Sequence, residues 1–413
     1  MDDRRPLWPI GSLVVLTGLN ILDYVDRWVL ASVFTPLKSD LHLRDEQLGM
    51  LQSAFTWGYF LTSPIFGYLG DRVPRRWLIA AGVAVWSCGT LLSGHAGTLT
   101  SLVLFRILVG FGEASFGTIS PAWISDLFPR ARRNNAISVF YLAIPVGSAL
   151  GYVIGGTIAA HWGWRAAFEW VGYPGLALAG LLLVLREPRR GASDDTPAGE
   201  QVRGWRSYAA LVRLPRYLLV VAGYAAQTFA LGGFAAWAPT FLIRIHHLSN
   251  EAANHFFGAA VAGTGLTATL AGGLLATRWQ HRTAVGYELV LALSSVAAAP
   301  LAFAAFMLPG LGWAKVALIA AMFLLFFSTG PVNTLILETV PSSMRASAMA
   351  ASIFSIHLFG DVWSPRLVGY FSDKWGDLQR GVLAVLPISV AACAICWCGL
   401  LAFAARRRIP AGA

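Results

Sequence analysis

Long apolar segments separated by short polar turns fill almost the whole chain. Each segment holds about 20 or more mostly apolar residues, which is the length an α-helix needs to cross a ~30 Å hydrocarbon core. The pattern therefore predicts an all-α membrane protein with twelve transmembrane helices. The expected spans cover residues 10–35, 46–70, 76–95, 98–125, 134–160, 166–186, 214–243, 251–277, 283–307, 313–339, 345–371 and 381–405.

One polar connection is much longer than the other turns. It covers residues 187–213 and divides six spans from six. We therefore expect an N-terminal six-helix bundle over residues 1–186, a cytoplasmic linker over 187–213 and a C-terminal six-helix bundle over 214–413. The two bundles should be pseudo-symmetric, because landmarks of the first half return in the same order in the second. These pairs are residues 67–76 with 273–282, Pro129 and Arg133 with Pro341 and Arg345, and Trp162 with Trp375.

Composition and charge exclude several classes of protein. The chain is 56% hydrophobic and 13% charged, whereas soluble domains carry about 25% charged residues. The net charge of +10 comes from short basic clusters between spans rather than from one stripe, so we expect no nucleic-acid partner. Most of these clusters fall on the side of the membrane that both termini share. The positive-inside rule therefore predicts cytoplasmic termini. Arginine greatly outnumbers lysine, and Ala and Gly are abundant, as in proteins from GC-rich bacterial genomes. We therefore expect a multi-pass protein of the plasma (inner) membrane.

The sequence offers no sign of catalysis. It contains no nucleotide-binding loop, no metal-ligand cluster and no nucleophile constellation. All four cysteines fall within apolar segments, where buried structural thiols are the expected state. We therefore expect no enzyme activity, no cofactor, no metal site and no ATP drive.

Five ionisable residues lie within two apolar spans. The first span holds Asp23, Asp26 and Arg27, and the fourth holds Arg106 and Glu113. Charge inside a membrane is costly, so each of these residues is a candidate functional group. Asp23 and Arg27 are four residues apart and share a helix face, as do Arg106 and Glu113 at seven.

If the first and fourth spans face each other, the five residues form a mixed cluster of acids and bases around a cavity. Burial favours the protonated form of a carboxyl group, and a neighbouring arginine favours the charged form. A conformational change that alters either influence would take up or release a proton, as a proton-coupled carrier requires. The alternative is a static ion-pair network that ties the spans together.

A basic turn follows the second span. Asp71, Arg72, Arg75 and Arg76 lie at the expected cytoplasmic surface, where charge is cheap, so we predict a cytoplasmic gate rather than a substrate contact. Asp71 beside a helix N-terminus of the other half could latch one state. Thr277 replaces the acid in the second copy, which predicts a weaker latch there.

The second half of the chain offers few polar groups within its spans. The candidates for lining a cavity are Gln227, Thr228, Asn333 and Thr334, to which we add Tyr141 from the first half. A cavity that is polar on one wall and apolar on the other would suit an amphipathic substrate. Gly147, Gly151 and Gly155 recur every four residues and indicate close helix packing instead.

Several motifs resemble those of the major facilitator superfamily and, more narrowly, of spinster-type transporters of sphingolipids and lysophospholipids. The resemblance implies a central cavity lined by the first, fourth, seventh and tenth spans. It also places Asp26, Arg27 and Glu113 at the family's proton-coupling and substrate-gating positions. Asp23 departs from the pattern, in which Asn is usual, and Asp361 matches it. The motifs are Gly67-x-x-x-Asp71-Arg72-x-x-Arg75-Arg76, Arg106-x-x-x-Gly110-x-Gly112-Glu113, Tyr24-Val-Asp26-Arg27, Ile144-Pro145-Val-Gly147, Trp237-Ala-Pro239 and His357-Leu-Phe-Gly360-Asp361.

The sequence thus predicts a proton-coupled secondary transporter that moves an amphipathic lipid or other small organic molecule by alternating access. Its expected partners are that substrate, protons and membrane lipids, and we expect a monomer. Two alternatives remain: an organic-anion or drug carrier of the same superfamily, and a transceptor that keeps the fold without transporting.

Overall fold

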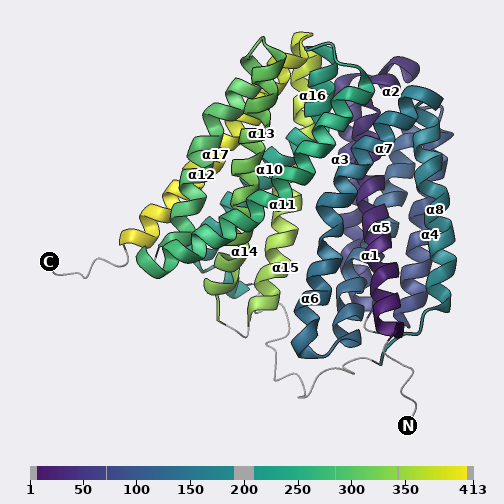
Figure 1. Cartoon of the computed structure of the whole chain (residues 1–413), viewed down its shortest axis with the longest axis horizontal. Coiled ribbons are helices and arrows are strands. Elements are labelled where there is room, and N and C mark those ends of the chain that lie inside the picture. Colours follow the sequence, from purple (N-terminus) through teal and green to yellow (C-terminus); the bar gives the residue numbers. More distant parts are fainter. Residues whose placement is uncertain (1–6, 71, 190–208, 284, 342–343, 407–413) are drawn as a thin grey trace. The chain divides into compact units, whose positions relative to one another are not determined.

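The structure, a computed structural model, describes residues 7–70, 72–189, 209–283, 285–341 and 344–406. All elements in these ranges are helices joined by turns and short connections (Figure 1). Ten helical segments among the described residues are long and apolar enough to cross a membrane. The two remaining predicted spans correspond to α3 and to the segment from α15 to α16.

The helices group into two compact units. Unit 1 comprises the described residues of Met1–Pro197 and Leu248–Ala259, and unit 2 those of Ala198–His247 and Ala260–Ala413. Unit 1 holds α1 (Leu7–Ser32), α2 (Phe34–Leu41), α3 (Asp45–Gly70), α4 (Arg75–Gly94), α5 (Leu99–Leu127), α6 (Arg130–Tyr141), α7 (Ala143–Trp162) and α8 (Trp164–Val184). Unit 2 holds α10 (Pro215–Arg244), α12 (Gly286–Met307), α13 (Leu311–Phe327), α14 (Thr329–Glu338), α15 (Arg345–Ile356), η2 (His357–Asp361), α16 (Ser364–Trp375) and α17 (Leu378–Arg406).

One helix, α11 (Asn250–Thr283), contributes to both units. Its first turns belong to unit 1, where the Asn254 side-chain amide donates a 3.0 Å hydrogen bond to the backbone carbonyl of Ser32. A methyl group at Gly258 would lie 2.7 Å from the carbonyl oxygen of Ala149, so only glycine permits this approach to α7. A division of the chain at the polar linker alone did not anticipate this arrangement, and the boundaries set there stay a prediction.

Three predicted spans are interrupted helices. Span 134–160 divides into α6 and α7, span 313–339 into α13 and α14, and span 345–371 into α15, η2 and α16. In each case a proline, Pro145, Pro331 or Pro365, lies in the first turn of the helix that follows the break. Proline lacks the N–H that would continue the preceding helix but fits a first turn, so the chain restarts there.

Glycines on α7 hold α1 close. A methyl group at Gly147 would lie 2.5 Å from the Ile21 carbonyl oxygen, and one at Gly151 would lie 2.9 Å from that of Val25. The predicted stripe of small residues therefore packs against the helix that carries Asp23, Asp26 and Arg27. This close packing fixes the rotation of α1, so that these polar side chains lie inside unit 1 rather than on its surface.

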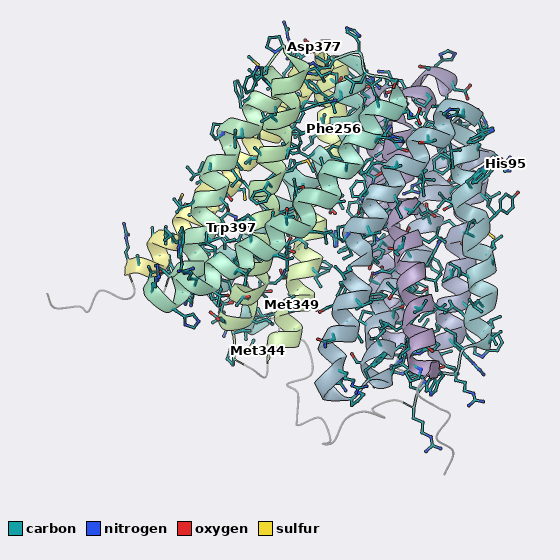
Figure 2. The ribbon with its side chains drawn as sticks, viewed as in Figure 1. His95, Phe256, Met344, Met349, Asp377 and Trp397 are labelled. Carbon is teal, nitrogen blue, oxygen red and sulfur yellow. The ribbon has the colours of Figure 1, made fainter. Side chains whose placement is uncertain are left out.

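Each unit has its own apolar core. Trp86, Phe116 and Trp123 lie at the centre of one core in unit 1. In unit 2 the fully buried Trp397 of α17 packs among residues of α10, α12 and α14 (Figure 2). Two separate cores agree with the duplicated architecture that the sequence landmarks predict.

Candidate functional site

The structure brings the five intramembrane ionisable residues together within unit 1. Arg27 of α1 donates from Nη2 to Oε2 of Glu113 on α5 at 2.9 Å, and from the same atom to Oδ2 of Asp23 at 3.4 Å. The Glu113 side chain is fully buried and that of Arg27 is 17% exposed. The first and fourth spans thus face each other. Asp23 and Arg27 form the pair that their four-residue spacing predicts.

A second ion pair lies beside the first. Arg106 donates from Nη1 to Oδ1 of Asp26 at 3.3 Å, and both side chains are buried. The Thr90 hydroxyl of α4 donates to the other oxygen of Asp26. Thr90 was not among the sequence candidates, because one threonine in an apolar span gives no signal of its own.

Aromatic rings enclose the two guanidinium groups. The Arg27 guanidinium lies 4.7 Å from the Tyr24 ring centroid, 4.9 Å from that of Phe55 and 5.5 Å from that of Tyr59. The Arg106 guanidinium lies 5.1 Å from the Phe55 centroid. Ring faces attract cations, most strongly where water is excluded. Phe55 of α3 therefore stabilises both charges, and Tyr59 of α3 stabilises that of Arg27. The sequence did not reveal this because aromatic residues are common in spans.

The cluster contains more acids than bases. Three carboxyl groups, from Asp23, Asp26 and Glu113, face two guanidinium groups, from Arg27 and Arg106. One oxygen of Asp23 (Oδ1) and one of Glu113 (Oε1) are buried without a hydrogen-bond partner. Asp23 and Glu113 both contact the same atom, Nη2 of Arg27. One proton on this pair of acids would neutralise the cluster and supply a donor that the pair lacks.

The predicted gate residues make their described contacts within unit 1. Arg75 donates from Nη1 to Oδ2 of Asp126 at 2.5 Å, and both side chains are largely buried. The backbone N–H groups of Arg75 and Arg76 donate to the Glu187 carboxylate at 2.9 and 3.3 Å. The acid therefore caps the N-terminus of α4, where negative charge is favourable.

Of the other two gate candidates, Arg72 and Asp71, only Arg72 lies among the described residues. Arg72 donates to the Tyr68 carbonyl oxygen at 3.1 Å, and its guanidinium lies 3.6 Å from the Tyr68 ring centroid. Asp71 lies outside the described residues. Sequence reasoning missed Asp126 and Glu187, although an acid at the end of a span near a basic turn is a usable signal for such pairs.

The cavity candidates of the second half mostly bond to nearby backbone. Gln227 is buried and donates from its amide nitrogen to the Leu325 carbonyl oxygen at 3.0 Å, so it joins α10 to α13. Thr228, Asn333 and Thr334 bond to carbonyl oxygens one turn earlier in their own helices. Tyr141 of unit 1 is 46% exposed. Their role in lining a cavity stays a prediction.

Asp361 pairs with a histidine of the same helical segment. Its two carboxylate oxygens lie 3.0 and 3.1 Å from Nδ1 of His357. Both residues belong to η2, a π-helical turn in which Gly360 has non-helical dihedral angles, with φ −105° and ψ −108°. The motif drew attention to Asp361, and the four-residue spacing from His357 is one at which helical side chains can pair.

Comparisons with known proteins agree with this architecture. The family model of the Major Facilitator Superfamily matches residues 16–365. Protein spinster homolog 1 of Homo sapiens is 33% identical in a match that covers 92% of this chain and 77% of the relative. The sphingosine-1-phosphate transporter SPNS2 of Danio rerio is also 33% identical, over 90% of this chain and 77% of the relative.

Solved structures show the same fold. A bacterial homolog of the human lysosomal transporter spinster, inward-facing and unoccupied, superposes with a TM-score of 0.83 at 24% identity, covering 97% of this chain and 96% of that one. A D-xylose–proton symporter superposes with a TM-score of 0.75 at 19% identity, covering 96% and 97%.

The chain is thus a multi-pass integral membrane protein with the twelve-helix transporter fold, and it is a transporter rather than an enzyme. It belongs to the spinster family of the Major Facilitator Superfamily.

Proposed function

We propose that this protein is a proton-coupled secondary transporter that moves an amphipathic lipid or other small organic molecule by alternating access. The observation that carries the proposal is the surplus acid in the buried cluster of unit 1. Three carboxyl groups against two guanidinium groups leave one negative charge uncompensated when all are ionised. Burying an unpaired charge is expensive, so the cluster favours one bound proton whenever water is excluded from it.

The pair of acids that contact Arg27 is the proposed seat of that proton. With both ionised, Arg27 serves two carboxylates, Asp23 and Glu113. With Glu113 protonated, Arg27 keeps one charged partner, and its link between α1 and α5 weakens. A state that admits water to the cluster favours the charged form and releases the proton, whereas a closed state retains it. Because the two states differ in their affinity for the proton, a proton gradient shifts their populations.

Two features support an amphipathic substrate. Arg27 Nε, together with Nε and Nη2 of Arg106, is buried without a hydrogen-bond partner, which leaves cationic donors for a polar or anionic headgroup. A relative of this chain is named for its transport of sphingosine-1-phosphate, an amphiphile with an anionic head. The candidates Gln227, Thr228, Asn333, Thr334, Tyr141 and Asp361 would line the substrate cavity.

The remaining features complete the proposal. The basic turn of Arg72, Arg75 and Arg76, with Asp71, would act as a cytoplasmic gate, for which the Arg75–Asp126 pair and the Glu187 cap supply a rigid base. Both termini would lie in the cytoplasm and the protein in the plasma (inner) membrane, as the distribution of arginines favours. The transporter would act as a monomer. Residues 187–213 would form the linker between its two six-helix bundles.

A reconstituted system tests the coupling and the substrate together. The purified protein in liposomes should accumulate one member of a panel of lysophospholipids, sphingoid phosphates and organic anions when a pH gradient is imposed, and not when the gradient is collapsed. Accumulation that is equal with and without the gradient would contradict proton coupling. Failure of every amphiphile alongside transport of a compact organic anion would contradict the substrate class.

Arg27→Ala should impair transport far more than Arg278→Ala. Arg27 holds two buried acids, so its loss leaves the cluster with three carboxyl groups and one guanidinium group. Arg278 of α11 is an exposed arginine, so it controls for the loss of one positive charge. Initial rates of gradient-driven uptake at matched reconstitution would measure the difference. Equal losses in the two variants would remove the special role of Arg27.

A further inference from the structure

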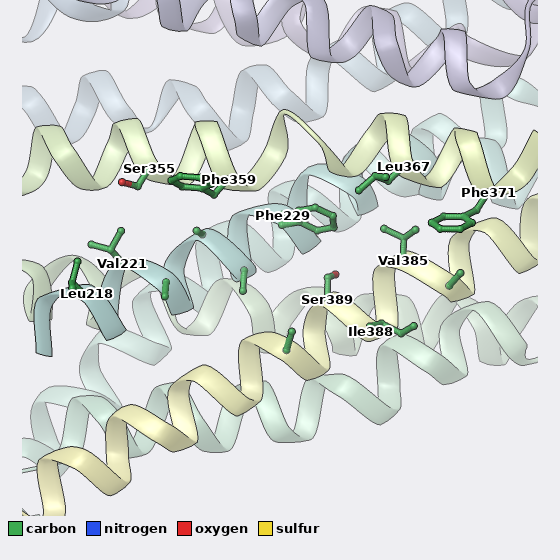
Figure 3. A pocket seen from close by; sticks show the side chains of 15 residues that line it. Leu218, Val221, Phe229, Ser355, Phe359, Leu367, Phe371, Val385, Ile388 and Ser389 are labelled. Atoms are coloured by element: carbon green, nitrogen blue, oxygen red, sulfur yellow. The ribbon is translucent and has the colours of Figure 1, made fainter. Parts of the chain in front are cut away.

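A large apolar pocket lies within unit 2, between α10, the segment from α15 to α16, and α17. Its volume is about 780 Å³. Figure 3 shows Phe229, Phe359 and Ile388, one from each of these three segments, around the pocket. The pocket is separate from the charged cluster, whose residues all belong to unit 1.

The chemistry of the wall selects hydrocarbon. Among the described residues that line the pocket, none is charged, and the hydroxyl-bearing ones are Ser355 and Ser389. Both hydroxyl groups are already used, because Ser355 donates to the Ala351 carbonyl oxygen at 2.8 Å and Ser389 to that of Leu386 at 2.7 Å. The lining therefore offers a headgroup no charged partner and no free hydroxyl donor, and its apolar side chains suit an alkyl chain.

The shape of the pocket follows the direction of the spans. Its lining runs from Ser355 to Phe371 along one wall, which is about 24 Å at ~1.5 Å per residue. The hydrocarbon core of a bilayer is about 30 Å thick. One chain extends over roughly half of that core, about 15 Å. The pocket is therefore an elongated groove, parallel to the membrane-spanning helices and long enough for one extended lipid chain.

The pocket is also open at its side. Phe359 is 64% exposed and Ile388 is 62% exposed, and both lie in or beside membrane-spanning helices. Where this side of the groove faces the bilayer, the surrounding medium is lipid rather than water. An empty groove would leave its lining without contact atoms on one side and forfeit their dispersion attraction. A chain inserted from the bilayer restores those contacts.

We propose that this groove is a binding site for one acyl chain of a bilayer phospholipid, distinct from the site of the transported substrate. Lipid tails are as apolar as leucine, so no hydrophobic force drives the chain into the groove, and its retention depends on the fit between chain and concave wall. Phospholipid surrounds the protein in large excess over any transported solute. Mass action therefore favours it as the occupant.

A lipid chain in the groove would contact the bent part of its wall, η2. Phe359 belongs to η2, which also contains Gly360 and the His357–Asp361 pair. A methyl group at Gly360 would lie 3.0 Å from the Ala225 carbonyl oxygen, so the bend packs directly on α10. A chain in the groove packs against the other side of this segment and fixes its distance from α17. The lipid thus acts as a removable part of the unit 2 core.

Photocrosslinking tests the site. The protein is reconstituted in phosphatidylethanolamine–phosphatidylglycerol vesicles that contain a phosphatidylcholine with a diazirine on one acyl chain. Irradiation should label peptides that carry Phe359 and Ile388 more strongly than the exposed face of α12. Ala222→Phe places a ring in the groove from an exposed lining position and should abolish that excess, whereas Ala297→Phe on the exposed face of α12 should leave it unchanged.

Ala392→Phe fills the groove from α17 and provides a second variant if Ala222→Phe fails to fold. Equal labelling of the groove and of α12 would show that lipid contacts this surface without a site, and would overturn the proposal. Labelling that a transported amphiphile displaces at low concentration would assign the groove to substrate, and would overturn it as well. Neither outcome depends on whether transport is coupled to protons.

Discussion

Glu113→Gln should abolish accumulation driven by a pH gradient while the protein still folds and inserts. Glutamine keeps the size of the side chain and can still accept a hydrogen bond from Arg27. It also leaves two carboxyl groups against two guanidinium groups, so the cluster no longer requires a proton to be neutral. One proton moved across one pH unit supplies ~1.4 kcal/mol, which supports about ten-fold accumulation of a neutral substrate. The variant should show none.

Uptake by proteoliposomes at several imposed gradients measures this effect. Glu338→Gln is the matched control, because Glu338 is an exposed acid at the end of α14 and its loss should leave accumulation unchanged. Exchange of labelled for unlabelled substrate without a gradient should survive in Glu113→Gln, since the variant resembles the protonated state. Normal gradient-driven accumulation by the variant would show that the proton is carried elsewhere.

The largest effect on stability is expected for Arg106→Met. Arg106 is completely buried and compensates Asp26, which is 1% exposed, so its removal leaves a charged acid without a cationic partner. Breaking a buried ion pair in this way costs about 3–5 kcal/mol. The double variant Arg106→Met/Asp26→Asn removes both charges and should recover most of the loss, because no unpaired charge then remains.

Thermal unfolding in detergent, followed by size exclusion, compares the two variants. Arg165→Met provides a control, since Arg165 pairs with Asp40 on the surface, where the two side chains are 43% and 45% exposed. Solvent screens such a pair, so the control should change the midpoint much less. If the double variant were as unstable as Arg106→Met alone, Arg106 would act through packing against Phe55 rather than through Asp26.

The hydrophobic pattern of the sequence determined the class of protein, the twelve spans and the two similar halves. It could do so because the bilayer imposes one requirement on every span: enough consecutive apolar residues to cross the core, with all backbone groups bonded within the helix. The same requirement makes charge inside a span rare and costly. Asp23, Asp26, Arg27, Arg106 and Glu113 could therefore be selected without any knowledge of packing.

Only the tertiary structure decided which of these groups meet. Arg27 contacts Glu113 across two helices as well as Asp23 on its own, and Arg106 takes Asp26 as its partner. Such pairings depend on the rotation and relative height of neighbouring helices. The close approach of α7 to α1 at Gly147 and Gly151 helps to set the rotation and height of α1. The periodicity of residues within one helix gives no information about such contacts between helices.

The same reason explains what the sequence did not reveal. Thr90 and Phe55 look ordinary in their own segments, and they become part of the site only through helices far away in the chain. The apolar groove of unit 2 is likewise invisible in a chain where every span is apolar. A sequence of this kind determines which residues enter the membrane, because insertion depends on the apolar character of each span taken by itself. The packing of whole helices decides which residues then face one another.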